Sequence, residues 1–205
     1  PQGLVYKGSD RYLGSVDTPC MSAAAKDLIE RAMSAKEPLY VVAIGAITNV
    51  ASAILLEPRI IEKIVVVWLG GNSLHWPNNH EFNLKQDVPA AQVVFDSGVP
   101  VIHVPCMPVA SHLTTTIYEL EYFLEGRNDI ATYLTKIFRE FLIEHKCLSK
   151  EIWDVSAVAA LINPEWVYTE VIHSPVLSER LTWSIDKGRH FIKSALSISR
   201  DAIFK

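Results

Sequence analysis

The fold is decided by the stretch LYVVAIGAITNV, residues 39–50. Its first six residues are apolar and rich in β-branched types, which is typical of a strand buried on both faces of a parallel sheet. Gly45 ends the apolar run, and Thr48 or Asn49 can cap a following helix over residues 48–56. The stretch therefore predicts the first strand and the crossover helix of a βαβ unit.

The alternation of strands and helices continues on both sides of this unit. Apolar runs at residues 64–69 and 99–104 predict two further buried strands, and the segments 22–35 and 88–96 predict helices. Helices that connect parallel strands lie on the faces of the sheet. We therefore expect an α/β fold with a parallel, Rossmann-like sheet that is covered by helices.

The second half of the chain predicts more peripheral elements. They are two helices within residues 116–146 separated at Gly126, a helix over 152–162 that begins at Trp153-Asp154, and a small C-terminal hairpin pairing 180–183 with 189–192. No repeat or linker divides the chain, so we expect residues 1–205 to form one domain. Because the sequence opens at Pro1 without a leader and closes on an apolar segment, we also expect a fragment or a processed product.

Composition excludes several classes of protein. Nineteen Lys and Arg face 23 Asp and Glu, for a net charge of −4, and no basic patch suits a nucleic acid. With 49% hydrophobic and 20% charged residues the chain is not a disordered protein. The longest apolar runs fall short of the roughly 20 residues that cross a bilayer. Three widely spaced cysteines suit neither a disulfide framework nor a zinc site, and favour a reducing, cytoplasmic location.

Polar residues collect where the predicted strands end, which is where α/β sheets bind ligands. Four segments qualify: residues 44–49, 70–83, 106–116 and 153–154. The second segment is the richest, with Asn72, His75, Trp76, Asn78, Asn79, His80, Glu81 and Asn83. We expect this edge of the sheet to hold the binding site of the protein.

Four motifs in this order resemble the nucleoside hydrolase family. They are AIGAITNVA at residues 43–51, LGG at 69–71, EFN at 81–83 followed by Asp87 and PAA at 89–91, and Asp154 with AVA at 157–159. Each motif alone is weak, but the four occur in register over most of the chain. The resemblance implies a nucleoside hydrolase-like fold and, in nucleoside catabolism, a calcium-dependent N-glycosidase that cleaves the bond between ribose and a nucleobase.

The resemblance also implies a metal site. In the family a backbone carbonyl and a later aspartate bind the ion, and they correspond here to Ile44 and Asp154. Such oxygen ligands suit a hard cation like Ca²⁺. The family's remaining carboxylates form a DxDxxxDD cluster that this sequence lacks and that we expect upstream of Pro1. We therefore expect this chain alone to bind calcium weakly and to be inactive.

The resemblance further implies a set of substrate-binding residues. The family's ribose-binding glutamate and asparagine correspond to Glu81 and Asn83, and a carboxylate beside an amide can bond neighbouring sugar hydroxyls. A further asparagine of the family corresponds loosely to Asn78 or Asn79. Leu69 and Phe82 are expected to line the same cleft.

One departure from the family concerns the leaving base. Trp153 stands where familiar members carry a histidine that protonates the base, and an indole cannot act as an acid near neutral pH. Trp153 and Trp76 can instead stack on a planar base. His75 or His80 is then the candidate proton donor.

Several of these residues also have a purely structural interpretation. Asp154 can be a helix cap, Glu81 and Asn83 can be solvated loop residues, and His75 and His80 can be surface residues. His103 lies within an apolar strand, where a hydrogen-bonded core histidine is the favoured interpretation.

Two classes of function remain. The first is a hydrolase of ribonucleosides or related small-molecule ribosides, for which a homo-oligomer is possible, and the second is a noncatalytic sugar- or carbohydrate-binding domain of the same fold. A Rossmann-type hydride or phosphate enzyme lacks support, because no glycine-rich phosphate loop follows any strand. Nothing in the sequence names the nucleobase.

The strand at residues 40–44 has an expected neighbour. If the aspartate-bearing strand of the family is absent, this strand would present an open edge, and open edges are normally paired or covered. We expect a second copy of the chain, an upstream peptide or residues 3–7 to pair with it.

Overall fold

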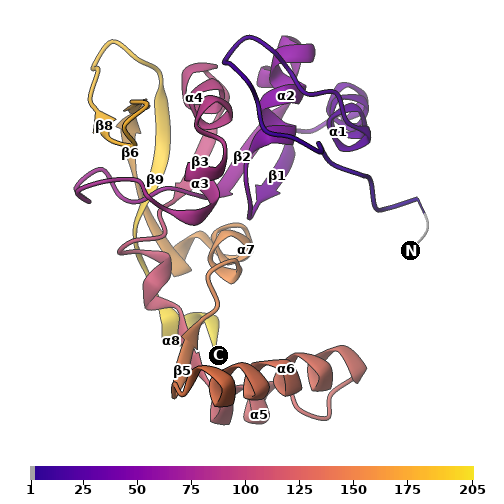
Figure 1. Ribbon diagram of the computed structural model, residues 1–205, viewed down its shortest axis with the longest axis vertical. Coiled ribbons are helices and arrows are strands. Elements are labelled where there is room, and N and C mark those ends of the chain that lie inside the picture. Colours follow the sequence, from indigo (N-terminus) through magenta and orange to yellow (C-terminus); the bar gives the residue numbers. More distant parts are fainter. Residues whose placement is uncertain (1–2) are drawn as a thin grey trace.

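The computed structural model describes residues 3–205, so Pro1 and Gln2 lie outside the described residues. Its centre is a five-stranded sheet with the order β1-β2-β3-β9-β6 (Figure 1). The strands are β1 (Leu39–Ala43), β2 (Ile64–Leu69), β3 (Val101–Val104), β9 (Phe191–Ile198) and β6 (Val167–His173). All neighbouring pairs are parallel except β6 with β9. The predicted α/β fold with a mostly parallel sheet is confirmed.

Helices cover both faces of this sheet. Three lie on one face and one on the other, and they are α1 (Ala23–Ser34), α2 (Thr48–Leu56) and α4 (Val88–Asp96) opposite α7 (Val155–Ile162). Side chains alternate along a strand, so Val66 and Trp68 of β2 pack with the first group while Val67 and Leu69 pack with α7. The β2 strand is therefore buried on both faces, as its apolar run predicts.

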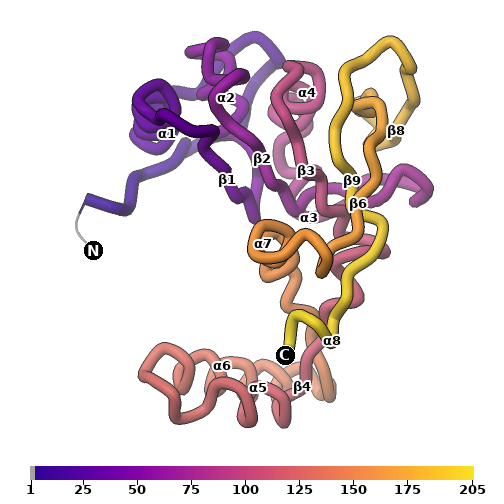
Figure 2. The backbone as a smooth tube through the Cα atoms, turned by 180° about the vertical axis from the view of Figure 1, so that it is seen from behind, coloured from indigo at the N-terminus to yellow at the C-terminus, as the bar shows by residue number. Residues whose placement is uncertain are grey.

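A helical pair stands apart from the sheet. It consists of α5 (Ile117–Phe123) and α6 (Asp129–His145), with Gly126 at a φ of 75° between them. Figures 1 and 2 show the pair at the opposite end of the molecule from α1, α2 and α4. The short sheet of β4 (Thr114–Thr116) and β5 (Ser149–Glu151) joins it to the core. Two peripheral helices separated at Gly126 are confirmed.

The remaining elements are short. They are the helices α3 (Phe82–Gln86) and α8 (Arg200–Ile203), the 3₁₀ helices η1 (Pro58–Glu62), η2 (Ala110–His112) and η3 (Pro164–Trp166), and the strands β7 (Val176–Leu177) and β8 (Trp183–Ser184).

The predicted C-terminal hairpin pairs the wrong residues. Residues 183–184 pair with 176–177 instead, and residues 191–198 form β9 inside the main sheet. Residues 167–173, for which the sequence pattern predicts no element, form the edge strand β6 beside β9. The antiparallel pairs at the C-terminus are therefore β6 with β9 and β7 with β8.

The β1 strand is partly buried on one face and exposed on the other. Leu39, Val41 and Ala43 pack against the core, whereas Tyr40 and Val42 are 53% and 38% exposed. Within the described chain β1 is the edge strand of the sheet and pairs with β2 alone. Residues 3–7 form no strand, and the Lys7 carbonyl accepts a hydrogen bond from Ala24 of α1. Pairing of β1 with residues 3–7 is therefore wrong, while a second copy or an upstream peptide stays a prediction.

Two polar side chains attach the N-terminal segment to the core. The N-cap position of α2 is Ile47, so the capping role predicted for Thr48 and Asn49 is wrong. The Asn49 Oδ1 instead accepts from the Ser9 amide at 2.9 Å, and the Thr48 hydroxyl donates to Asp87. Asp87 is the N-cap of α4 and also accepts from the Leu13 amide, so Asn49 and Asp87 attach residues 9 and 13 to the core.

Within residues 3–205, no helix has both the length and the apolar composition needed to cross a membrane.

Replacement of Asp87 by alanine should strongly destabilise the fold. The buried carboxylate accepts from the amides of Leu13 at 3.0 Å and Ala90 at 3.1 Å and from the Thr48 hydroxyl. Loss of a cap and of these bonds costs about 3 kcal/mol of unfolding free energy, measurable by urea denaturation. Asp129→Ala, at an exposed site in the first turn of α6, is the control and should cost less than about 1 kcal/mol. Equal losses in both variants would contradict this role for Asp87.

Candidate functional site

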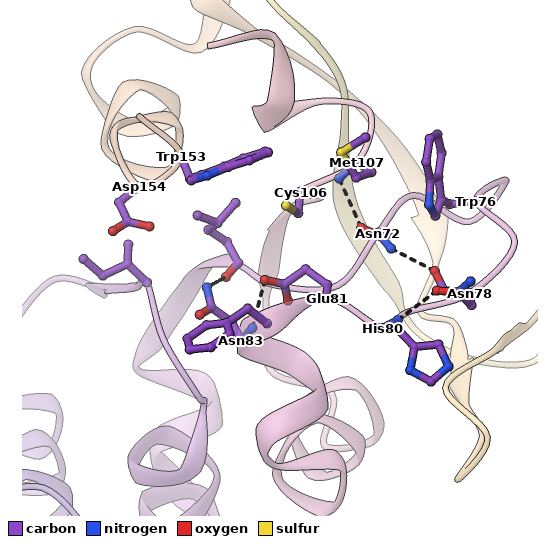
Figure 3. A pocket seen from close by; sticks show the side chains of 13 residues that line it. Asn72, Trp76, Asn78, His80, Glu81, Asn83, Cys106, Met107, Trp153 and Asp154 are labelled. Atoms are coloured by element: carbon purple, nitrogen blue, oxygen red, sulfur yellow. Dashed lines mark hydrogen bonds between the residues drawn. The ribbon is translucent and has the colours of Figure 1, made fainter. Parts of the chain in front are cut away.

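One cavity of about 620 Å³ lies at the carboxyl edge of the sheet, within the size range of small-molecule sites. It is lined by Ile44, Leu69, Asn72, Trp76, Asn78, His80, Glu81, Phe82, Asn83, Cys106, Met107, Trp153 and Asp154. Figure 3 shows Trp153 and Asp154 on one side of it and the labelled residues 72–83 on the other. The site therefore has two walls that come from different parts of the chain.

The first wall is built on a tight turn at the end of β2. Gly71 has a φ of 72°, and a Cβ on Gly70 would lie 2.2 Å from the Trp68 ring, so neither position tolerates a side chain. The Trp68 indole also donates to the carbonyl of Gly45 at 3.0 Å, next to the end of β1. One buried indole thus supports two adjacent strand ends.

Glu81 serves both the fold and the pocket. It is only 8% exposed and is the N-cap of α3, accepting from the amides of Asn83 at 2.8 Å and Leu84 at 2.9 Å. The Gly71 amide donates to the same carboxylate at 2.7 Å. A carboxylate has about four lone-pair sites, so these three bonds leave room for about one ligand hydroxyl. The interpretation of Glu81 as a solvated loop residue is wrong.

Asn83 is held in one orientation by the end of β2. Its Nδ2 donates to the Leu69 carbonyl at 2.8 Å, which fixes the nitrogen end of the amide. The Oδ1 is then free to accept a hydrogen bond from a sugar hydroxyl. Buried at the same turn as Glu81 (Figure 3), Asn83 gives this wall a second oxygen acceptor.

The second wall contains Asp154 at the N-cap position of α7. The Asp154 carboxylate makes no capping hydrogen bond, so its interpretation as a helix cap is not supported. Partial burial raises the pKa of Asp154 above its ordinary value, and the nearby Lys150 ammonium opposes that shift. The Asp154 residue is exposed and makes no capping bond, so its carboxylate is free to meet a ligand or a cation.

Trp153 stands beside it on the same wall. The Lys150 ammonium lies 5.6 Å from the centroid of the Trp153 ring and 5.6 Å from that of Phe141 in α6. Cations within about 6 Å of a ring are attracted to its face. Lys150 therefore connects the indole to the peripheral helix.

Cys106 and Met107 were not among the individually predicted site residues. Both follow the end of β3 and belong to segment 106–116, which the rule that ligands bind at strand ends had selected. Burial raises the pKa of the Cys106 thiol to about 12, with Glu81 and Glu151 adding to the shift. The thiol is thus neutral at physiological pH and offers the pocket a weak, uncharged donor.

The structure brings most of the predicted site residues together. The six residues expected to share one cleft, Ile44, Leu69, Glu81, Phe82, Asn83 and Asp154, all line the cavity, as do Trp76, Asn78, His80 and Trp153. That shared location is confirmed, while the chemical role of each residue stays a prediction.

Asn79 and His75 lie elsewhere. Asn79 is fully buried, and its Oδ1 accepts from the Asn72 amide at 2.8 Å, while its Nδ2 has no partner within the described part of the chain. His75 lines a neighbouring cavity of about 390 Å³ together with His173. Of the two predicted histidines, His80 is the one in contact with the main cavity.

The described residues alone do not fit a calcium ion. Among residues 3–205 no three His, Cys, Asp or Glu side chains gather in a way that could hold a metal. The Asp154 carboxylate and the Ile44 carbonyl have the right chemistry, but two oxygens are too few for an ion that takes six to eight.

His103 lies beneath the first wall as a buried residue. Its Nε2 donates to the Gly70 carbonyl at 2.8 Å, so its Nδ1 accepts from the Ser194 hydroxyl at 3.2 Å. Burial lowers the pKa of His103 to about 4, against a weaker opposing effect of the bond to Gly70. The predicted hydrogen-bonded core histidine is confirmed.

Comparisons of the sequence with known proteins agree on one family. A family model described as inosine-uridine preferring nucleoside hydrolase matches residues 5–200. The pyrimidine-specific ribonucleoside hydrolase RihA of Escherichia coli O9:H4 (strain HS) is 30% identical over 149 residues, which cover 69% of this chain and 46% of that protein. The same-named protein of Klebsiella pneumoniae (strain 342) is 28% identical over 162 residues, with 73% and 50% covered. The chain thus spans about half the length of these curated relatives.

Solved structures show the same fold. A purine-preferring ribonucleoside hydrolase from Gardnerella vaginalis superposes with a TM-score of 0.76 at 20% identity, covering 93% of this chain and 68% of that one. An inosine-uridine preferring nucleoside hydrolase from Bacillus anthracis superposes with a TM-score of 0.71 at 19% identity, covering 88% and 62%.

Acidification should destabilise the protein through His103. The pKa of His103 is about 4 in the native state against 6.5 as its ordinary value. Between those values the unfolded chain binds a proton that the native state does not, so unfolding free energy falls as the pH drops through this window. The full effect is about 3 kcal/mol. Urea denaturation at pH 7 and 4.5 measures it, and His103→Gln should lose this part of the pH dependence. If the unfolding free energy of the native protein and of His103→Gln depends on pH in the same way, this prediction is contradicted.

Proposed function

The chain belongs to the inosine-uridine preferring nucleoside hydrolase family, and from this premise we propose that its cavity binds the ribose and base of a ribonucleoside or a related riboside. The reaction is hydrolysis of the N-glycosidic bond. The observation that carries the proposal is the convergence of Glu81 and Asn83 with two tryptophans and Asp154 around one cavity. Oxygen acceptors for sugar hydroxyls and aromatic faces for a planar base are both present there.

The ribose is held by the wall at the end of β2. Sugar hydroxyls donate to the free lone pair of the Glu81 carboxylate and to the Asn83 Oδ1. Both side chains are buried and are fixed by backbone hydrogen bonds. Because they do not need to reorganise on binding, they hold the anomeric carbon in one position.

The base stacks on the tryptophans. Trp153 presents one face to the cavity, and Trp76 lines the opposite wall (Figure 3). Offset or edge contacts with an aromatic base add stabilisation beyond the buried area. The indoles supply no proton near neutral pH, so they bind and orient the leaving group.

Bond cleavage then requires a proton for the base and a stabilised sugar cation. We assign the proton to His80, which lines the cavity, with His75 as the more distant alternative. The bond from the anomeric carbon to the base nitrogen breaks and the oxygen of a water molecule bonds to that carbon. The proton that this water releases replaces, in net terms, the one that His80 gives to the base. Positive charge that develops on the ring is stabilised by the carboxylates of Glu81 and Asp154.

Ile44 and Asp154 are the proposed calcium ligands of a complete site. The carbonyl and the carboxylate account for two of the six to eight oxygens that Ca²⁺ prefers. Further ligands must therefore come from outside residues 3–205 before the ion is held tightly.

Binding should depend on Asn83. Titration of the chain with inosine and with uridine should quench the fluorescence of Trp76 and Trp153, and Asn83→Ala should weaken the affinity about tenfold, the equivalent of one hydrogen bond. Asn163→Ala, at the cap of η3 and outside the cavity lining, should not change it.

The outcomes separate the two classes of function. Equal losses in both variants, or no quenching by any nucleoside, would contradict the proposed site. If nucleosides quench the fluorescence but no base is released, even by a longer chain that supplies further calcium ligands, the result would favour the noncatalytic sugar-binding protein.

The chain by itself should show neither tight calcium binding nor turnover. Two ligand oxygens predict a dissociation constant above about 1 mM, because complete oxygen sites of low affinity already lie near that value. Calorimetric titration with CaCl₂ measures it, and release of base from inosine with and without Ca²⁺ should stay at the background rate. Micromolar binding that Asp154→Asn abolishes, or calcium-dependent turnover, would show that the residues present suffice.

A further inference from the structure

Two ring N–H groups from outside the cavity hold the turn at the end of β2. The His103 Nε2 donates to the Gly70 carbonyl at 2.8 Å, and the Trp183 Nε1 donates to the Asn72 carbonyl at 2.9 Å. Neither ring lines the cavity. Between the two bonded carbonyls lies Gly71, whose amide donates to Glu81.

The two donors are held rigidly by aromatic packing. Phe95 packs edge-on against both rings, with centroids 5.6 Å from His103 and 5.2 Å from Trp183, and the two rings are 6.1 Å apart. His103 is buried and Trp183 is half-buried, and packed rings with two χ angles each lose little freedom when they hydrogen-bond. The cluster can therefore fix the direction of the two carbonyls.

Trp183 belongs to a segment that contacts both ends of the pocket loop. The loop is residues 72–80, which carries Trp76, Asn78 and His80. Its first residue is bonded by Trp183 as described, and near its other end the Asn79 amide donates to the Leu181 carbonyl at 2.7 Å. Residues 176–184, which contain β7 and β8, therefore form hydrogen bonds near both ends of the loop.

The backbone of this bridging segment is strained where it meets the loop. Leu181 has a φ of 58°, a conformation that a branched side chain rarely adopts. Residues in such regions persist when the surrounding contacts impose them, and they cluster at functional sites. The strained residue is the one whose carbonyl receives Asn79.

We propose that Trp183 and His103 are positioning residues of the site, which hold the pocket loop and the Glu81 carboxylate in their binding geometry. They act through the turn and touch no ligand. The inference rests on the proposed function in taking a nucleoside as the ligand, but its structural part stands independently.

Hydrogen exchange tests the structural part without any ligand. In the full chain, Trp183→Phe keeps an aromatic ring at this position but removes the indole N–H. Peptides covering residues 72–80 should then exchange at least tenfold faster, while peptides of α1 and α2 are unchanged. Trp166→Phe is the matched control, since it removes a half-buried indole N–H outside the cavity and should leave residues 72–80 unchanged. An unchanged rate at 72–80, or faster exchange in every peptide, would overturn the proposal.

A conservative variant tests the same idea at His103. The Nε2 of a glutamine reaches about as far as that of histidine, so His103→Gln should keep the bond to Gly70 and the slow exchange of residues 72–80. His103→Leu should behave as Trp183→Phe. Fast exchange in both His103 variants would overturn the role of the donated hydrogen bond.

Nucleoside affinity provides the functional readout. Inosine should bind about five- to tenfold more weakly to Trp183→Phe than to Trp166→Phe. If the two variants differ in the exchange of residues 72–80 but bind inosine equally well, the positioning role would be overturned. A native chain that binds no nucleoside would overturn the proposed function, and the exchange difference would still decide whether the two rings hold the loop.

Discussion

The structure of the site depends on one constraint, which is that the turn at the end of β2 must pair its backbone groups without water. Side chains supply most of the partners. Asn83 binds the Leu69 carbonyl, Glu81 the Gly71 amide, and His103 and Trp183 the carbonyls of Gly70 and Asn72. A buried polar group without a partner costs about 1–3 kcal/mol, so the loss of any one of these side chains weakens the turn.

This constraint also determines what Glu81 can do for a ligand. A buried carboxylate is costly unless N–H donors compensate it, and three backbone amides do so here. Those donors fix the carboxylate in place and use most of its lone pairs. The result is a preorganised acceptor with limited remaining capacity, which suits selective recognition of a hydroxyl better than general binding of cations.

Local sequence signals predicted a good part of this arrangement. The β2 run is buried on both faces and α4 spans the expected residues 88–96, because a buried strand and a helix are both encoded by patterns of neighbouring residues. The exposed face of β1, the pairing of β9 with β3, and the role of Trp183 were not predictable in this way. Each depends on which distant segment lies alongside, and no pattern within a window of ten residues contains that information.

The two walls of the cavity are fixed to different degrees, and this difference follows from the same packing. The wall with Glu81 and Asn83 is attached to the central sheet by buried hydrogen bonds and an aromatic cluster. The wall with Trp153 packs against the buried cluster around α7 and contacts α6 through Lys150, whose side chain is 32% exposed, pairs with Glu151 and makes cation–π contacts with both rings. Exposed contacts of that kind are worth about 0.5–1 kcal/mol. A change at α6 is therefore expected to reach the wall with Trp153 through Lys150 before it reaches the wall with Glu81 and Asn83.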